Sequence, residues 1–222
     1  IFARGQFVAV GFGGMILTSR DGVAWQERNV GAQRWLRALA WNGQRFVAVG
    51  DNEVFSSDDG ANWERRHTAH SNFILGNATW SGSGFLVFSP GALLTSPDGI
   101  IWEERPAAPS IAMLQRVIWS GSQFVAVGAF GTVAASRDAI NWTMHQAAGG
   151  PNLLDLIWTG TDFVGVGQSG AILTAGIPIA GALAITISPQ PQSEYVGGAV
   201  QFSVTAIGTA PLRYQWRLNG RV

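Results

Sequence analysis

The sequence predicts an all-β fold built from repeated four-stranded sheets. An apolar run begins with Phe every 39 residues, at Phe7, Phe46, Phe85, Phe124 and Phe163. Four of these Phe residues follow a Trp by five positions, and a second Trp closes each of the first four repeats. The runs between are rich in Val, Phe and Trp and are bounded by Gly, Asn and Asp, which is typical of short strands joined by tight turns. A fixed period of this size indicates a repeat architecture.

The clearest repeat, WNGQRFVAVGDNEVFSSDDGANW, shows how one unit is built. Asn42-Gly43 predicts a hairpin turn, because both residues accept the positive φ that such a turn requires. Other turns containing Gly separate the remaining strands. The strands expected in this unit are 36–41, 45–50, 53–57 and 62–66. Four strands in roughly 40 residues are typical of one β-propeller blade, and at least five blades are expected here.

The turn before the second Trp has its own pattern, which reads SSDDGANW in the clearest copy. It resembles the Asp-box, Ser-x-Asp-x-Gly-x-x-Trp, of sialidase-type (BNR) and photosystem-assembly-factor-type propellers. Only the copy at 56–63 matches that spacing in full. Asp and Ser side chains bind turn amides, so a structural role is expected. The residues assigned to these turns are Ser19, Asp21, Gly22, Trp25, Ser56, Asp58, Asp59, Gly60, Trp63, Ser96, Asp98, Gly99, Trp102, Ser136, Asp138 and Trp142.

The repeats are expected to end near residue 176, followed by a linker at 177–188. The segment 189–222 changes character: its alternating pattern predicts a half-buried strand, and it resembles the start of a bacterial immunoglobulin-like (Ig-like) domain with Trp216 in the core. The first repeat lacks most of its first strand. The chain is therefore expected to be a fragment of a six- or seven-bladed propeller, truncated at both ends, with further blades and Ig-like modules in the same protein.

Composition excludes several functions. The 14 basic residues, all Arg, balance 14 acidic residues, and no basic stripe favours a nucleic-acid partner. The absence of Cys excludes disulfides and thiolate chemistry. The uncharged stretch 170–193 is interrupted by Gly176, Pro178 and Gly181, so no membrane span is expected. No cofactor is implied. His67 and His70 lack supporting carboxylates at a suitable spacing, so no metal site is expected either.

No catalytic residues are predicted. The sialidase resemblance implies a Tyr nucleophile, and the only Tyr residues are Tyr195 and Tyr214, which lie outside the repeats. The candidate ligand-binding residues are those that vary on the otherwise apolar first strand, which lines the central channel of a propeller. They are Arg37, Asn77, Gln115, Arg116 and Asp155. Variable polar residues there suggest a ligand-reading channel mouth. The alternative is that they only hydrate the channel.

The function expected from these observations is non-catalytic binding. The combination of a propeller with an Ig-like module resembles large secreted or cell-surface bacterial proteins, which implies an adhesin-like chain that recognises a glycan or a protein. Two alternatives stay open. The chain could belong to a glycan-cleaving hydrolase whose catalytic residues lie outside it, or it could be a scaffold similar to an assembly factor.

Overall fold

A computed structural model of the chain describes residues 1–30, 35–69, 74–89, 92–106, 113–146, 150–176, 184–187 and 205–207. Within these residues the chain forms four four-stranded antiparallel sheets, one three-stranded sheet and one two-stranded sheet. The strands of each larger sheet follow one another in sequence order. This is the arrangement that the 39-residue repeat predicts, because short turns join strands that are neighbours in space.

The first five sheets are called blades 1 to 5. Blade 1 contains β1 (Phe2–Ala3), β2 (Gln6–Val10), the 3₁₀ turn η1 (Phe12–Gly14), β3 (Met15–Ser19) and β4 (Gln26–Asn29). Blade 2 contains β5 (Ala38–Trp41), β6 (Phe46–Gly50), β7 (Glu53–Ser57) and β8 (Glu64–Thr68). Blade 3 contains β9 (Asn77–Trp80), β10 (Phe85–Ser89), β11 (Ala92–Ser96) and β12 (Glu103–Pro106).

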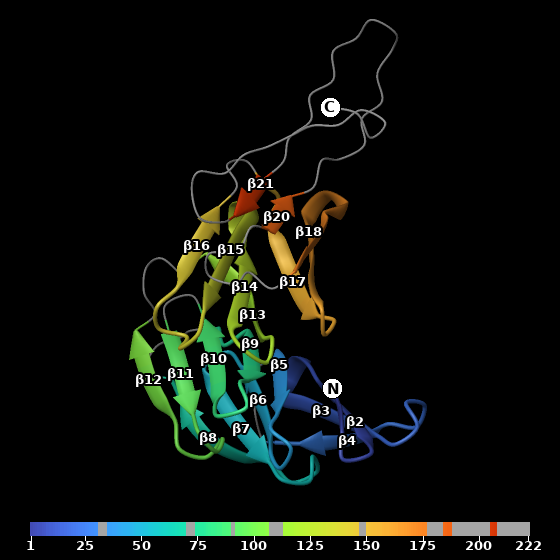
Figure 1. The fold of residues 1–222 in the computed structure, drawn as a ribbon. Helices are drawn as coiled ribbons and strands as arrows, with labels where there is room; N and C mark the ends of the chain where they lie inside the picture. Colours follow the sequence, from blue (N-terminus) through green and yellow to red (C-terminus); the bar gives the residue numbers. More distant parts are fainter. Residues whose placement is uncertain are drawn as a thin grey trace, which may run out of the picture.

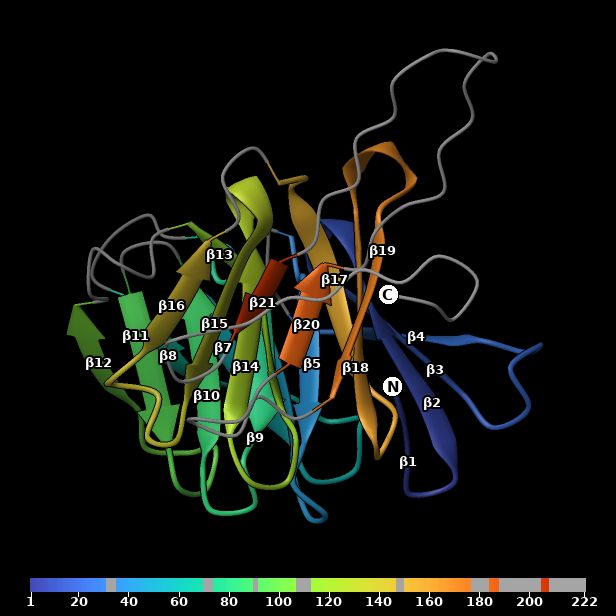
Figure 2. The same cartoon turned by 45° about the horizontal axis from the view of Figure 1, so that its top comes forward.

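Blade 4 contains β13 (Leu114–Trp119), β14 (Phe124–Gly128), η3 (Ala129–Gly131), β15 (Thr132–Ser136) and β16 (Thr143–Gln146). Blade 5 contains β17 (Leu153–Trp158), β18 (Asp162–Gly167), η4 (Gln168–Gly170) and β19 (Ile172–Gly176). Successive blades follow one another along an arc (Figure 1). The first strands β5, β9, β13 and β17 contact one another in turn and form the inner edge of that arc (Figure 2). The described residues therefore form a β-propeller architecture with five blades in view, in agreement with the prediction of at least five. The total of six or seven blades stays a prediction.

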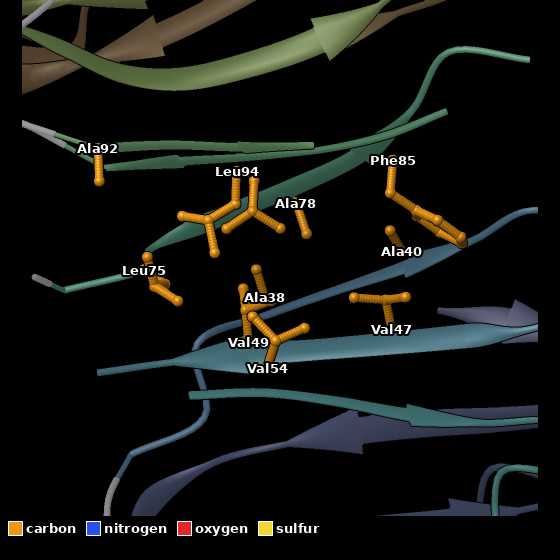
Figure 3. Close-up of a cluster of buried hydrophobic side chains, with 11 residues drawn as sticks. Ala38, Ala40, Val47, Val49, Val54, Leu75, Ala78, Phe85, Ala92 and Leu94 are labelled. Atoms are coloured by element: carbon orange, nitrogen blue, oxygen red, sulfur yellow. The ribbon is translucent and has the colours of Figure 1, made fainter. Parts of the chain in front are cut away.

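The hydrophobic core lies between blades and is divided into four clusters, one for each pair of neighbours. In the cluster between blades 2 and 3, side chains from β5, β6 and β7 point toward side chains from β9, β10 and β11 (Figure 3). Val47, Val49, Leu75, Phe85 and Leu94 are almost completely buried there. Each blade therefore stabilises its neighbour, because one face of a sheet cannot bury its apolar side chains alone.

The remaining sheet is a hairpin of β20 (Ala184–Ile187) and β21 (Thr205–Ile207), and β20 lies beside β19. β20 falls within the segment expected to be a linker, and β21 falls within the segment expected to begin an Ig-like domain. The rest of 177–222 lies outside the described residues, so the domain boundary at 188 and the Ig-like module stay predictions.

Candidate functional site

The turn before the second Trp is held by one aspartate and one serine. In blade 2 the backbone N–H groups of Ala61 and Asn62 donate to Asp59 Oδ1, both at 2.8 Å. The N–H of Gly60 donates to Ser57 Oγ at 2.8 Å, and Ser57 Oγ donates to Asp59 Oδ1 at 3.0 Å. Trp63 closes the turn, with Nε1 donating to the Gly60 carbonyl at 2.9 Å. These bonds are all made within the turn itself, which is the pattern of a structural role.

The structure corrects the residues assigned to this turn in blade 2. Ser57 and Asp59 hold it, whereas Ser56 and Asp58 lie outside the network. Ser56 Oγ accepts a hydrogen bond from Arg66 Nε at 2.8 Å, and Asp58 pairs with Arg45 at 2.7 Å. The turn in blade 2 is therefore one residue shorter than the Ser-x-Asp-x-Gly-x-x-Trp spacing.

The bonds to the aspartate recur in blades 1, 3 and 4, where Asp and Gly (or Ala139) are adjacent, although Trp102 Nε1 in blade 3 has no hydrogen-bond partner among the described residues. Asp21, Asp98 and Asp138 each accept two backbone N–H bonds and one bond from a serine hydroxyl. The N–H groups of Asn141 and Ile140 and the Asn141 amide hold the pKa of Asp138 well below its usual range. Hydrogen bonds from these backbone N–H groups favour the charged form of each carboxylate, so the pKa values of Asp21 and Asp98 are lowered as well.

The predicted ligand-binding residues lie on the first strands or at their start. Arg37 is exposed at the start of β5, where its Nη2 pairs with Asp51 Oδ1 at 3.4 Å. Its guanidinium lies over the Trp35 ring, 4.9 Å from the ring centroid. The Trp35 N–H donates to the other oxygen of Asp51 at 3.2 Å. Arg37, Trp35 and Asp51 thus form one small cluster at the end of blade 2.

Two other predicted residues meet across blades 4 and 5. Arg116 Nε lies 3.0 Å from Asp155 Oδ1, although the angle at Nε is not that of a hydrogen bond. Asp155 Oδ1 also accepts the N–H of Leu156 at 2.8 Å. Gln115 is exposed on β13 next to this pair. Arg116 and Asp155 therefore converge, whereas Arg37 is engaged in its own cluster.

Asn77 behaves differently from the other predicted residues. It lies on β9 and is almost completely buried, where blade 2 has the apolar Ala38. Neither Nδ2 nor Oδ1 of Asn77 has a hydrogen-bond partner among the described residues. A buried amide without hydrogen-bond partners costs folding free energy. Asn77 is therefore an unpaired polar side chain buried at the inner edge of blade 3.

Exposed apolar side chains, which the sequence reasoning missed, lie at both ends of the blades. Val23, Ile101 and Ile140 lie on the aspartate turns, and a second set lies at the end that carries the predicted residues. Each first strand pairs antiparallel with its second strand, so the start of one lies beside the end of the other. This end is called the mouth. Its large exposed apolar residues include Phe12, Trp35, Ile74, Met113, Phe130 and Leu154. The sequence did contain a signal for these residues: large apolar side chains stand in expected turns and loops, where small or polar residues would be enough.

The mouth residues are held by contacts between neighbouring segments. Phe12, in η1, packs edge-on against Trp35 with ring centroids 5.5 Å apart. The N–H of Phe130, in η3, donates to Asn152 Oδ1 at 2.9 Å. Phe130 has φ +54°, an uncommon conformation for a bulky residue. These contacts keep apolar rings at the surface on an ordered backbone, which is a property of binding surfaces.

A cavity of about 180 Å³ lies at the opposite end, between blades 3 and 4. Gly84, Trp119, Phe124, Asp138 and Ala139 are among its lining residues. In the two preceding interfaces a side chain fills the corresponding space. Gln6 Nε2 donates to the Asp59 carbonyl at 2.6 Å, and Arg45 Nη1 donates to the Asp98 carbonyl at 3.1 Å. Gly84 occupies the position of Gln6 and Arg45 in the repeat, so the cavity is the space of a missing side chain.

In the part of the chain that the structure describes, no three His, Asp or Glu side chains come together as a metal site would require. His67 Nε2 instead contacts Glu104 Oε2 at 3.2 Å, across blades 2 and 3. The same described residues include no helix that is long and apolar enough to cross a membrane. His70 lies outside them.

Comparison with known proteins supports the fold. No family model matches the chain, and no curated protein matches it. Similar solved structures include YCF48 bound to D1 peptide, with a TM-score of 0.60 and 17% identity over 78% of this chain and 62% of that one. YCF48 from Cyanidioschyzon merolae has a TM-score of 0.58 and 15% identity over 93% of this chain and 70% of that one. Virginiamycin B lyase from Staphylococcus aureus has a TM-score of 0.63 and 7% identity over 75% of this chain and 64% of that one.

These similarities define a class of protein, the β-propellers. At identities this low they show the fold alone, and fold does not determine function. The chain spans about three-fifths of the length of the first YCF48 structure. One of these propellers was solved with a bound peptide.

Proposed function

We propose that this chain is a non-catalytic binding module whose mouth binds an exposed segment of a protein partner. The observation that carries the proposal is the set of large apolar side chains at one end of the blades, at Phe12, Trp35, Ile74, Met113, Phe130 and Leu154. Exposed apolar groups of this size are costly in water and gather at interaction sites. Aromatic residues and Arg are also the side chains that contribute most to binding energy in protein interfaces.

The charges at the mouth suggest how a peptide would be oriented. Arg37 and Gln115 are exposed, and Asp155 pairs with Arg116 at the inner edge. Polar groups of this kind fix the orientation of a ligand, while the apolar groups supply most of the affinity. That a similar propeller, YCF48, has been solved with a peptide is consistent with a peptide partner and supports a scaffold role similar to that of an assembly factor.

A glycan is the second candidate ligand. It is favoured by one cluster, in which the exposed Trp35 ring adjoins the charged groups of Arg37 and Asp51. A flat aromatic ring beside hydrogen-bonding groups suits the apolar face and the hydroxyls of a sugar. Glycan binding at Trp35 would not explain why Ile74, Met113 and Phe130 are also exposed, so we favour a peptide ligand.

The type of propeller and the kind of protein that contains it are inferred from the resemblances in the sequence. We infer an Asp-box type propeller followed by the start of an Ig-like domain, in a secreted or cell-surface bacterial protein. The turn networks at Asp21, Asp59, Asp98 and Asp138 support the Asp-box type, although the Ser and Asp spacing is one residue shorter. A non-catalytic role is favoured because the described carboxylates of the turns are committed to backbone amides.

The test is a binding screen with matched variants. The chain would be screened against a random peptide library and a glycan array, and binders would be measured by calorimetry. Trp35→Ala and Phe130→Ala should each weaken a peptide binder about tenfold or more, as for residues at the centre of an interface. Ile101→Ala is the control, because Ile101 is apolar and even more exposed than Trp35 and Phe130 but lies on the turn at the opposite end. Binding that only Ile101→Ala weakens would overturn the proposal, and glycan binding lost with Trp35→Ala would favour the second candidate.

A further inference from the structure

The cavity between blades 3 and 4 corresponds to a space that a side chain fills at two other interfaces. Between blades 2 and 3, Arg45 Cδ lies 3.2 Å from the Cβ position of Gly99, and Arg45 Nη1 donates to the Asp98 carbonyl at 3.1 Å. Between blades 1 and 2, Gln6 Nε2 donates to the Asp59 carbonyl at 2.6 Å. Each of these side chains ends in a flat group whose N–H donates to the carbonyl of a turn aspartate.

The walls of this space are present between blades 3 and 4, although the side chain is missing. Leu86, Phe124 and Ala139 line the cavity and are buried. They take the repeat positions of the residues that surround the filled space between blades 2 and 3. Gly84 takes the repeat position of Arg45. The cavity is therefore a preformed space that suits a group of the kind found at the end of an Arg or Gln side chain.

Two polar groups of blade 4 stand at the cavity without partners. The Asp138 carbonyl corresponds to the carbonyls that Gln6 and Arg45 bind, and it accepts no hydrogen bond within the described part of the chain. Arg137 also lines the cavity, is exposed, and forms no hydrogen bond or ion pair with any described residue. The carboxylate of Asp138, in contrast, is bound by amides of its own turn. The cavity thus offers one acceptor and one cationic donor to a ligand.

The charges around the cavity favour a neutral ligand over a cation. Between blades 2 and 3, the Arg45 guanidinium is neutralised by Asp58, with Nε and Oδ1 2.7 Å apart. In blade 3 the position of Asp58 is taken by Pro97, which has no charge. Arg137 instead brings a positive charge to the cavity. A cation held there would lack this counter-ion and would lie near a like charge, which disfavours it.

The size of the cavity and its walls suit a flat apolar body. The volume is about 180 Å³. An apolar protein cavity of about 150 Å³ is large enough to hold benzene. Trp119 and Phe124, whose ring centroids are 4.7 Å apart, both line the cavity. A ring-sized ligand can therefore pack against these aromatic side chains and still place a polar group at the turn of blade 4.

We propose that the cavity between blades 3 and 4 is a binding site for small, flat, neutral amides. The amide N–H donates to the Asp138 carbonyl, as Gln6 does at the first interface, and the amide oxygen accepts from Arg137. The apolar body of the ligand packs against Phe124 and Leu86. This site lies at the opposite end from the mouth, so it stands or falls separately from the peptide binding proposed there.

Three probes of nearly equal shape test the chemistry of the site. Benzamide is neutral and carries N–H donors, benzamidine is a cation at neutral pH, and benzoate is an anion without a donor. Each would be titrated while NMR follows the indole N–H of Trp119, with Trp25 in blade 1 as the internal control. Benzamide should shift the Trp119 signal with a millimolar or tighter Kd, as its few atoms allow. Benzamidine and benzoate should each bind about threefold more weakly or worse, as the loss of one exposed polar contact allows.

Two variants show whether the probe lies in the cavity. Gly84→Gln should abolish benzamide binding, because the new side chain fills the cavity as Gln6 fills its own interface. The substitution leaves room for the Cβ, which would lie 3.4 Å from the Ser96 carbonyl oxygen. Ser122→Gln is the control, since it adds the same side chain to an exposed position in the corresponding turn of blade 4, and binding should not change. Arg137→Ala should weaken benzamide and narrow its advantage over benzamidine.

Several results would overturn the proposal. They are an unchanged Trp119 signal at the solubility limit of benzamide, equal binding of the three probes, and benzamide binding that Gly84→Gln leaves intact. Circular dichroism would check the fold of each variant. If Gly84→Gln fails to fold, Arg137→Ala decides, because this exposed side chain can be shortened without disturbing the core. An unchanged preference for benzamide over benzamidine in Arg137→Ala would then overturn the assignment of the ligand.

Discussion

Gly84 and Ala139 line the same cavity between blades 3 and 4. Blades 1 and 2 have Gln6 and Arg45 at the repeat position of Gly84, and the other turns have Gly at the position of Ala139. Ala139 has φ +60°, where the other turns have Gly22, Gly60 and Gly99. A Cβ at Gly60 would lie 2.8 Å from Gln6 Nε2, and one at Gly99 would lie 3.2 Å from Arg45 Cδ. A methyl group is tolerated at position 139 because position 84 carries no side chain to meet it.

This relationship predicts coupled effects of substitution. Gly84→Arg alone should destabilise the chain by about 1–3 kcal/mol, because the new side chain meets the Ala139 methyl group. In the Ala139→Gly background the same change should cost little, since the arginine can then take the place that Arg45 has in the preceding interface. Urea unfolding of the two single variants and the double variant gives the coupling free energy, expected at about 1 kcal/mol or more. Additive effects would contradict the account.

Comparing Trp25 with Trp63 shows how much packing against a neighbouring blade adds to the stability that the closing Trp provides. Each donates Nε1 to the carbonyl of its own turn, at 3.1 Å and 2.9 Å. Only Trp63 packs in a core cluster between two blades, whereas Trp25 is exposed. Trp63→Ala should therefore cost about 3–5 kcal/mol of unfolding free energy. Trp25→Ala should cost about 1 kcal/mol, the loss expected of its hydrogen bond. Urea unfolding of both variants measures the difference, and equal losses would show that packing between blades is not the cause.

The turn aspartates predict a dependence of stability on acid. Burial acts to raise the pKa of Asp59, but the N–H groups of Asn62 and Ala61 outweigh it and hold this pKa below its usual range. Because the folded pKa is depressed, the stabilisation is fully present above the unfolded pKa of about 4 and is lost as the pH falls toward the folded pKa. Asp59→Asn should cost about 1 kcal/mol at neutral pH, like a lost side-chain cap.

The acid dependence is measured by urea unfolding between neutral pH and pH 3. The difference between wild type and Asp59→Asn should shrink as the pH falls. Glu27→Gln on β4, at an exposed carboxylate outside the turns, serves as the control and should follow the wild type. A constant difference over the whole range would mean that the charge of Asp59 has no part in the stability of the turn.

The blades could be predicted from the sequence because the repeat is strict. The 39-residue step from Phe46 to Phe85 fixes which residues pair and which face is buried, and β5 to β12 follow it. The turn in blade 2 was misassigned by one residue because Ser56-Ser57 and Asp58-Asp59 are doublets that fit two registers. Only the hydrogen bonds to Ser57 and Asp59 distinguish them.

The mouth was predicted only in part. Variable polar residues on the first strands pointed to it, and Arg116 and Asp155 do meet there. The apolar residues could not be found by position within the strands, because Phe12 and Phe130 lie in turns between second and third strands, outside the pattern of strand burial. The pairing of Arg37 with Asp51 depends on how two segments 14 residues apart fold back on each other, which no single-strand pattern shows.

Amide hydrogen exchange with a bound peptide tests the central claim most directly, namely that the mouth is the binding surface. A peptide selected from the library would be added at saturation, and exchange would be compared with the free chain. The account predicts added protection at 35–37, 113–116 and 128–131, where mouth residues lie, and no change at the turns 20–24 and 98–101. Protection confined to those turns, with unchanged exchange at the mouth, would contradict it.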